Sequence, residues 1–182
     1  MELKTLKGKK VHLRALEPED LDTLYTIEND ESLWNVGETI TPFSKHILKE
    51  YLSNAHKDIF EVGQLRLVIC ENATNNVLGM VDLFDFDAHN LRAGVGIAIS
   101  SEKNRRKGFG KEALELVCGY CKQHLVLHQI FANIEASNTS SSTLFEALGF
   151  KLIGSKKEWH RKRNFETNTI VYTDELFYQL IF

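Results

Sequence analysis

One segment constrains the fold more than any other, because its hydrophobic period changes on either side of a basic turn. Residues Ala93–Ile99 form an apolar run with two glycines, typical of a buried strand. Residues Gly110–His124 instead carry apolar side chains at helical spacing, and Gln129–Glu135 return to a strand pattern. A helix between two strands must bury its apolar face against their sheet. The segment therefore predicts a sheet with a helix packed on it.

The flanking patterns extend this sheet along the chain. Further strands are predicted at Val11–Leu16, Leu65–Cys70, Val77–Phe84, Phe150–Ile153 and Thr167–Tyr172. Helices are predicted to open at Glu17–Asp20, at Ser44 and over Ser140–Leu148. The order βααβββαβαββ predicts a mixed α/β fold. Because no linker or repeat is evident, we expect a single domain over residues 1–182.

Composition narrows the functional classes. The 182 residues are 43% hydrophobic and 26% charged, which excludes a disordered tail or a coiled-coil rod. A net charge of -3 disfavours a strongly basic nucleic-acid binder. Three cysteines are too few for a disulfide framework, and no apolar leader or membrane-length apolar run is present. We therefore expect a cytoplasmic protein with no membrane partner and no nucleic-acid partner.

The turn Ser100–Gly110 has the chemistry of a phosphate site. Glycines allow successive backbone N–H groups to converge at the positive end of the following helix, and three cations, Arg105, Arg106 and Lys107, lie beside them. The alternative is a solvated basic turn. Two common phosphate motifs do not fit: the Walker loop fails because Glu112 follows Gly110–Lys111, and the dinucleotide fingerprint fails because Ala113 replaces its third glycine.

A second segment, Asn138–Phe150, follows the next strand, and the two segments together resemble the GNAT superfamily of N-acetyltransferases. Its acetyl-CoA loop, [QR]-x-x-G-x-[GA], is matched by Arg105–Gly110. Its later motif, N-x-x-[SA]-x-x-L-[YF]-x-x-x-G-F, is matched by Asn138, Ser141, Leu144, Phe145, Gly149 and Phe150. The opening Val11–Leu21 and the stretch Asp85–His89 are similar to the branch that holds spermidine and ribosomal-protein N-terminal acetyltransferases.

This resemblance implies a mostly antiparallel central sheet with splayed fourth and fifth strands and helices on both faces. It also implies that acetyl-CoA binds as cosubstrate, with its pantetheine arm in the gap between those strands and its pyrophosphate on the basic loop. No metal is implied. The cofactor-binding residues expected on this basis are Ile97, Ala98, Ile99, Arg105, Arg106, Lys107, Gly108, Phe109, Gly110, Lys111, Asn138, Ser141 and Phe145.

The reaction implied is direct attack by a primary amine in a ternary complex. The chain departs from the family pattern at two positions: Phe145 stands where many relatives have a tyrosine acid, and the fourth strand lacks the glutamate that some carry. Acid or base candidates are Asp82, Asp85, Asp87 and Ser141, with Ser142 and Tyr120 as further acids. Because residues two apart in a strand share a face, we expect Asp85 and Asp87 to act together.

For the acceptor, Glu31, Trp34, Glu38 and Asp85 are candidate contacts, since an acidic and aromatic wall suits a cation. A polyamine or other small amine is favoured over a protein N-terminus, and a homo-oligomer is compatible with the sequence.

Two alternative functions stay open. One is an acetyl-CoA sensor without turnover. The other is an RNA contact through Lys156–Arg163, which we expect to be a solvated hairpin between the last two strands.

Overall fold

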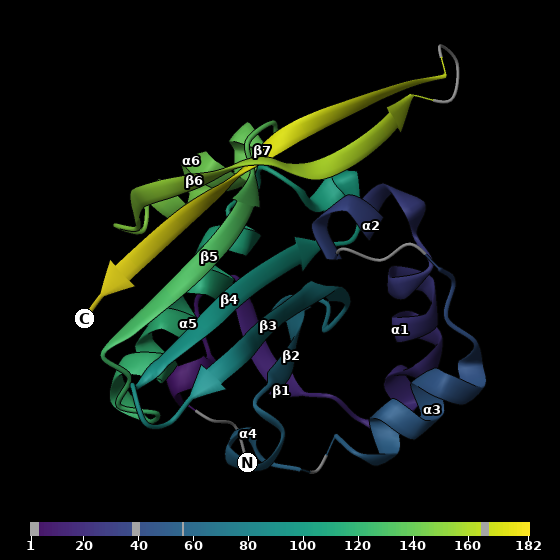
Figure 1. The fold of residues 1–182 in the computed structure, drawn as a ribbon. Helices are drawn as coiled ribbons and strands as arrows, with labels where there is room; N and C mark the ends of the chain where they lie inside the picture. The colour runs from purple at the N-terminus through teal and green to yellow at the C-terminus, as the bar shows by residue number, and fades with distance from the viewer. Residues whose placement is uncertain (1–3, 38–40, 56, 165–167) are drawn as a thin grey trace.

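The computed structural model describes residues 4–37, 41–55, 57–164 and 168–182 (Figure 1). Its centre is a seven-stranded sheet in the order β1-β2-β3-β4-β5-β7-β6, antiparallel throughout except for the parallel pair β4–β5. The strands are β1 (Val11–Ala15), β2 (Leu65–Glu71), β3 (Val77–Asp87), β4 (Arg92–Ile99), β5 (Gln129–Glu135), β6 (Lys151–Asn164) and β7 (Thr169–Ile181).

Helices cover both faces of this sheet. They are α1 (Leu21–Glu28), α2 (Glu31–Gly37), α3 (Lys45–Ser53), α4 (Ile59–Val62), α5 (Phe109–Gln123) and α6 (Thr139–Glu146), with short 3-10 turns at Lys4–Leu6, Pro18–Asp20 and Glu102–Asn104. Consecutive residues of β3 point to opposite faces of the sheet and so contact different helices. Val81 packs in a core with Leu114 of α5, whereas Met80 packs in a second core with Leu24 of α1 and Leu48 of α3. Helices α1 to α3 lie together at one side of the molecule (Figure 1). The mixed α/β architecture with helices on both faces is therefore confirmed.

The fourth and fifth strands diverge, as expected. They pair only from Arg92–Gly94 to Gln129–Phe131. β5 then continues along β7 as far as the Glu135–Glu175 pair, while β4 continues along β3 to Ile99. The edge of β4 that faces β5 is thus left without a strand partner beyond Gly94, within the described residues. An extended ligand could add to that edge as another strand would.

Helix α5 is tied to the start of the chain by a partly exposed carboxylate contact. The Glu112 carboxylate accepts hydrogen bonds from the backbone N–H groups of Lys9, Lys10 and Val11, at 2.9, 2.7 and 2.8 Å. Burial raises the pKa of Glu112, but these N–H groups outweigh it, so that the pKa lies below its usual range. The contact fixes the first turn of α5 against β1.

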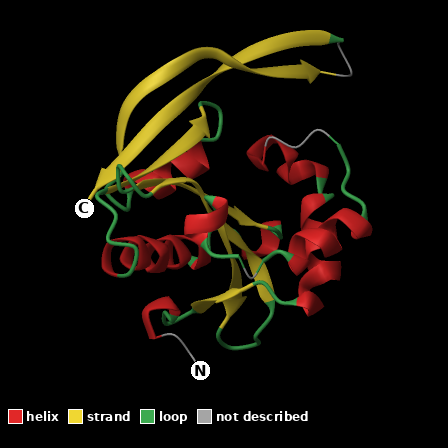
Figure 2. Ribbon diagram, turned by 60° about the horizontal axis from the view of Figure 1, so that its bottom comes forward, coloured by secondary structure: helices red, strands yellow, loops and turns green. Residues whose placement is uncertain are grey.

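The last two strands are longer than the sequence pattern predicts. The Lys156–Arg163 segment lies inside β6, so it forms one arm of the β6–β7 hairpin instead of the turn between two shorter strands. The two strands continue past the rest of the sheet as a long ribbon (Figure 2). The charged residues of β6 do not alternate with apolar ones, so its sequence lacks the alternation by which a strand is predicted. Helices α2 and α4 were also not predicted, and none of the described helices has the length and apolarity to cross a bilayer.

Candidate functional site

A cavity of about 810 Å³ lies where β4 ends and α5 and α6 begin. Ten of the thirteen expected cofactor residues line it: Ile97, Ala98, Ile99, Arg105, Arg106, Gly108, Gly110, Lys111, Asn138 and Ser141. They come from two segments that the chain separates by a helix and a strand. The structure therefore brings most of the two sequence motifs to one cavity, which we call the cofactor cavity.

The first turn of α5 gives this cavity an anion cradle. Gly108 is the N-cap of α5 and has φ +85°, a left-handed conformation that favours glycine. The first N–H groups of a helix have no acceptor within it, and they lie at its positive end. Arg105 and Arg106 line the same cavity, and Arg105 Nε donates to the carbonyl of Ile99 at 3.2 Å. N–H groups and guanidinium groups arranged in this way suit a phosphate or pyrophosphate.

Three expected cofactor residues do not line the cofactor cavity. Phe109 is buried in the core, and the Lys107 carbonyl accepts a hydrogen bond from Lys10 Nζ at 2.9 Å. Phe145 is also buried, with its ring centroid 4.9 Å from that of Phe150. It borders a second cavity instead.

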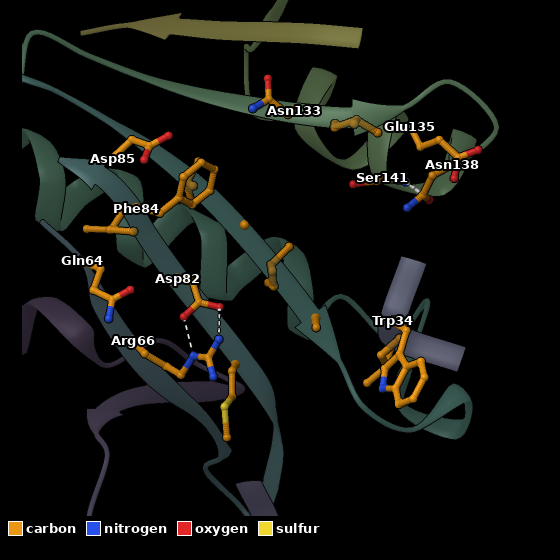
Figure 3. A pocket seen from close by; sticks show the side chains of 18 of the residues that line it. Trp34, Gln64, Arg66, Asp82, Phe84, Asp85, Asn133, Glu135, Asn138 and Ser141 are labelled. Carbon is orange, nitrogen blue, oxygen red and sulfur yellow. Dashed lines mark hydrogen bonds and ion pairs between the residues drawn. The ribbon is translucent and has the colours of Figure 1, made fainter. Parts of the chain in front are cut away.

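The second cavity, of about 560 Å³, adjoins the first and is called here the acceptor cavity. The two share Leu33, Ile97, Ala98, Asn138 and Ser141 as lining residues. Figure 3 shows Trp34 at one end, with Asn133 and Glu135 of β5 across the cavity from Arg66 and Asp82. Residues of both diverging strands, β4 and β5, line the acceptor cavity, and those of β4 line the cofactor cavity as well.

An ion-pair cluster forms one wall of the acceptor cavity. Arg66 of β2 binds Asp82 of β3 through two hydrogen bonds, Nε to Oδ1 at 2.6 Å and Nη2 to Oδ2 at 3.1 Å, and it also contacts Glu28 of α1 (Figure 3). The guanidinium carbon lies 5.7 Å from the ring centre of Tyr51. Burial lowers the pKa of Arg66, but the neighbouring carboxylates raise it by more. Asp82, a candidate base, is therefore engaged by a permanent cation.

The structure separates Asp85 from Asp87. The register between β3 and β4 shifts between Phe84 and Asp87, and Asp85 has φ +48°. Asp85 lines the acceptor cavity. Asp87 instead caps the following turn, where it accepts from Asn90 N at 2.9 Å and from Asn90 Nδ2 at 2.7 Å. The expectation that the two carboxylates share a face is wrong, because a bulge breaks the alternation of the strand.

The other acceptor candidates are divided as well. Trp34 lines the acceptor cavity, and its Nε1 donates to the Glu28 carbonyl at 2.9 Å. Glu31 is exposed at the start of α2 and lines neither cavity, and Glu38 lies outside the described residues. Trp34 is thus the one of these three that the structure places at the site.

The hydroxyl candidates are separated in the same way. Ser141 lines both cavities, and its backbone N–H donates to Asn138 Oδ1 at 3.1 Å. Ser142 and Tyr120 line neither cavity, and the Tyr120 ring stacks on His124 at 5.5 Å. Of these hydroxyls, only that of Ser141 belongs to a residue at the junction of the cavities.

A second charged cluster at the acceptor cavity was not predicted from the sequence. Glu175 of β7 is buried between Lys156, at 2.5 Å, and His160, at 3.1 Å. Opposite it on β5, Glu135 is paired with Lys162 at 2.6 Å. Burial raises the pKa of Glu135, but hydrogen bonds from Lys162, Ser137 and Thr173 bring it below its usual range. The one sequence signal was the carboxylate of Glu175, which precedes a segment, 176–181, that has no other charged side chain and one amide, that of Gln179.

Cys118 and Cys121, three residues apart, line neither cavity. No group of three or more His, Cys, Asp or Glu side chains in the described part of the chain is arranged to hold a metal ion. Cys118 and Cys121 lie within α5, and burial raises the pKa of each thiol to about 12. At neutral pH both are unreactive thiols.

Comparison with known proteins gives consistent matches. A model of the acetyltransferase (GNAT) domain family matches residues 10–151. The SPbeta prophage-derived N-acetyltransferase YokL of Bacillus subtilis is 29% identical over 151 residues, which cover 83% of this chain and 81% of that protein. N-alpha-acetyltransferase 50 of Danio rerio is 25% identical over 139 residues, 75% of this chain and 77% of that one.

Among solved structures, a spermidine N-acetyltransferase from Vibrio cholerae, in complex with CoA and spermine, superposes with a TM-score of 0.80 at 22% identity. The match covers 96% of each chain. At this identity the likeness establishes the fold.

Proposed function

Since this chain belongs to the GNAT acetyltransferase family, we propose that it transfers the acetyl group of acetyl-CoA to a small cationic amine of the polyamine type. A protein N-terminal amine is the second candidate acceptor. The observation that carries the proposal is the junction of the two cavities, where an anion cradle opens into an acidic chamber.

The cofactor cavity has the donors that a CoA molecule requires. The N–H groups of residues 108–111, with Arg105 and Arg106, would bind the pyrophosphate, and the unpaired edge of β4 would hold the pantetheine arm. When bound, acetyl-CoA supplies an acetyl group activated as a thioester. Asn138, which lines both cavities, accepts from Ser141 N through Oδ1, so its side-chain N–H groups would serve as donors to the bound cosubstrate.

The acceptor cavity has the charge that a polyamine requires. Its lining residues include five carboxylates, Glu28, Asp82, Asp85, Glu135 and Glu175, against one arginine and one histidine, Arg66 and His160. Two lysines outside the lining, Lys156 and Lys162, pair with Glu175 and Glu135, so the carboxylates still outnumber the permanent cations. Trp34 adds an aromatic face, which favours a cation further. The Vibrio cholerae protein of similar fold is described as a spermidine N-acetyltransferase, which supports this choice of acceptor.

The reaction is direct attack of the amine on the thioester carbon. A C–N bond forms, the C–S bond breaks, and CoA leaves as a thiolate, while the nitrogen loses its protons. An aliphatic amine is protonated at neutral pH, so a proton must leave before the attack. Phe145 takes no part in proton transfer because its side chain has no ionisable group.

The test is the rate of CoA release from acetyl-CoA across spermidine, spermine, aminoglycosides, amino acids and short N-terminal peptides. We expect saturable release with the polyamines. Saturable release with peptides alone would overturn the choice of acceptor but leave the transferase. No release with any amine, together with a melting temperature that rises on acetyl-CoA addition, would favour a sensor of acetyl-CoA instead.

A further inference from the structure

Strand β6 carries an irregularity at the acceptor cavity. Along the β6–β7 ladder, Lys156 pairs with Glu175 and the next pair is His160 with Thr173. β6 therefore has two more residues than β7 over this interval, and Glu158 within it has φ +50°. In a regular ladder, residue 158 would lie opposite Thr173. The bulge puts His160 there instead, on the same face as Lys156 and Glu175.

The contacts of His160 determine which ring nitrogen holds a proton. Its Nε2 lies 3.1 Å from Glu175 Oε2, and the other oxygen of Glu175 lies 2.5 Å from Lys156 Nζ. A carboxylate paired with a lysine only accepts, so Nε2 donates and carries a hydrogen. In the neutral ring, Nδ1 is then the acceptor nitrogen, and no hydrogen-bond partner for it is found among the described residues.

His160 is also placed where an acceptor amine would bind. Its side chain is 21% exposed and lines the acceptor cavity, whereas the side chain of Glu175 is 4% exposed. The charged groups that line the cavity, or that pair with its lining residues, are Lys156 and Lys162 of β6, Glu175 of β7, Glu135 of β5, Asp82 and Asp85 of β3, Arg66 of β2 and Glu28 of α1.

Three further carboxylates of the cavity are already engaged by other groups. Asp82 and Glu28 are bound to Arg66. Glu135 accepts from three donors that lower its pKa. Histidine is the side-chain class that exchanges a proton near neutral pH, and a carboxylate that orients its second nitrogen is a recurrent arrangement for a general base.

We propose that Nδ1 of His160 takes the proton from the acceptor ammonium, and that Glu175 is the positioning residue that fixes the ring. This inference rests on the proposed function. The ammonium gives one proton to His160, the neutral amine attacks the thioester, and the C–S bond breaks as the C–N bond forms. The amide nitrogen loses its second proton to solvent or to the thiolate, and His160 returns its own to solvent.

The test is the pH profile of kcat/KM for the amine identified as acceptor, with wild type and His160→Gln. We expect a loss of roughly 100-fold at pH 7. The deficit should shrink as the pH rises toward the pKa of the amine, because solvent then removes the proton. Added imidazole should partly restore the rate of His160→Ala. The melting-temperature rise on acetyl-CoA addition should be unchanged.

Two further variants separate a base from a structural residue. Glu175→Gln keeps an acceptor oxygen for the ring, and we expect a smaller loss with a shifted pH profile. His46→Gln, an exposed position on α3, should leave the profile unchanged. A deficit for His160→Gln that is equal at every pH, or no deficit, would overturn the role of His160. A wild-type protein that acetylates no amine would instead overturn the proposed function, and this inference with it.

Discussion

Asp85 and Asp87 lie two residues apart in β3 and have different surroundings, which makes them a matched pair for testing the acceptor cavity. Asp85→Asn removes a charge from the cavity lining while keeping a residue type that tolerates positive φ. We expect KM for spermidine to rise about threefold to tenfold, with kcat little changed, since a lost charge contact of about 1 kcal/mol is of that size.

Asp87→Asn is the control, because that carboxylate caps a turn outside the cavity. Its KM for spermidine should equal that of the wild type even if the turn is weakened. Steady-state kinetics at low and high salt measure both variants, and the Asp85→Asn effect should diminish at high salt. Equal KM values for the two variants would argue against an electrostatic role for the cavity.

Two glycines of helix α5 test the phosphate cradle, because alanine substitution should have opposite effects on stability at the two positions. Ala at Gly108 forces a side chain into a left-handed conformation, at a cost of about 1–2 kcal/mol, and its Cβ would lie 3.2 Å from Lys10 Nζ. We expect a lower melting temperature and roughly tenfold weaker acetyl-CoA binding.

Gly119 lies in the interior of the same helix, and a Cβ there would meet no atom within 4 Å. Gly119→Ala should therefore raise the free energy of unfolding by about 0.5–1 kcal/mol and leave acetyl-CoA binding unchanged. Denaturant unfolding and calorimetric titration measure both variants. Normal acetyl-CoA affinity in Gly108→Ala would contradict the cradle.

The start of α1 carries a pH-dependent contribution to stability. Arg14 of β1 binds Asp20 through two hydrogen bonds at 2.7 and 2.8 Å, and this guanidinium lowers the pKa of Asp20. A lowered pKa in the folded state stabilises the protein above the ordinary pKa of the group, and that stabilisation is lost as the pH falls through the folded-state value. Asp20→Asn should thus lose about 2 kcal/mol at pH 7.

The difference between wild type and Asp20→Asn should shrink as the pH falls below about 4. Urea unfolding at a series of pH values measures it. Asp22→Asn serves as the control. Asp22 and Lys45 form an exposed ion pair on the surface, and this pair should contribute no measurable stability. A difference that stays constant down to low pH would contradict the assignment to the Arg14–Asp20 pair.

Across the molecule, the sequence predicted those strands and helices whose buried face leaves a regular hydrophobic period in the sequence. The strand, glycine turn and helix around Gly108 could be read directly, because backbone conformation and hydrophobic period are local properties. The cluster of His160, Glu175 and Glu135 could not. It depends on a bulge in β6 and on register between strands distant in the sequence, and neither leaves a periodic signal.

The bulge at Asp85 was not predicted for the same reason. In a regular strand Asp85 and Asp87 would share a face, and the bulge breaks that alternation. The cofactor cavity was therefore largely predictable and the acceptor cavity was not. Most residues of the first come from two contiguous motifs, while those of the second are collected from α1, α2, α3, α6 and six strands.

In the proposed function, the two cavities form one continuous site in which the amine and acetyl-CoA meet. The most direct measurement is calorimetric binding of a conjugate in which the preferred amine is joined to the CoA sulfur through an acetyl bridge. We predict that it binds roughly 100-fold more tightly than CoA and competes with both substrates, because the second binding event becomes intramolecular. A conjugate that binds no more tightly than CoA, or that competes with acetyl-CoA alone, would show that the two cavities do not form one site.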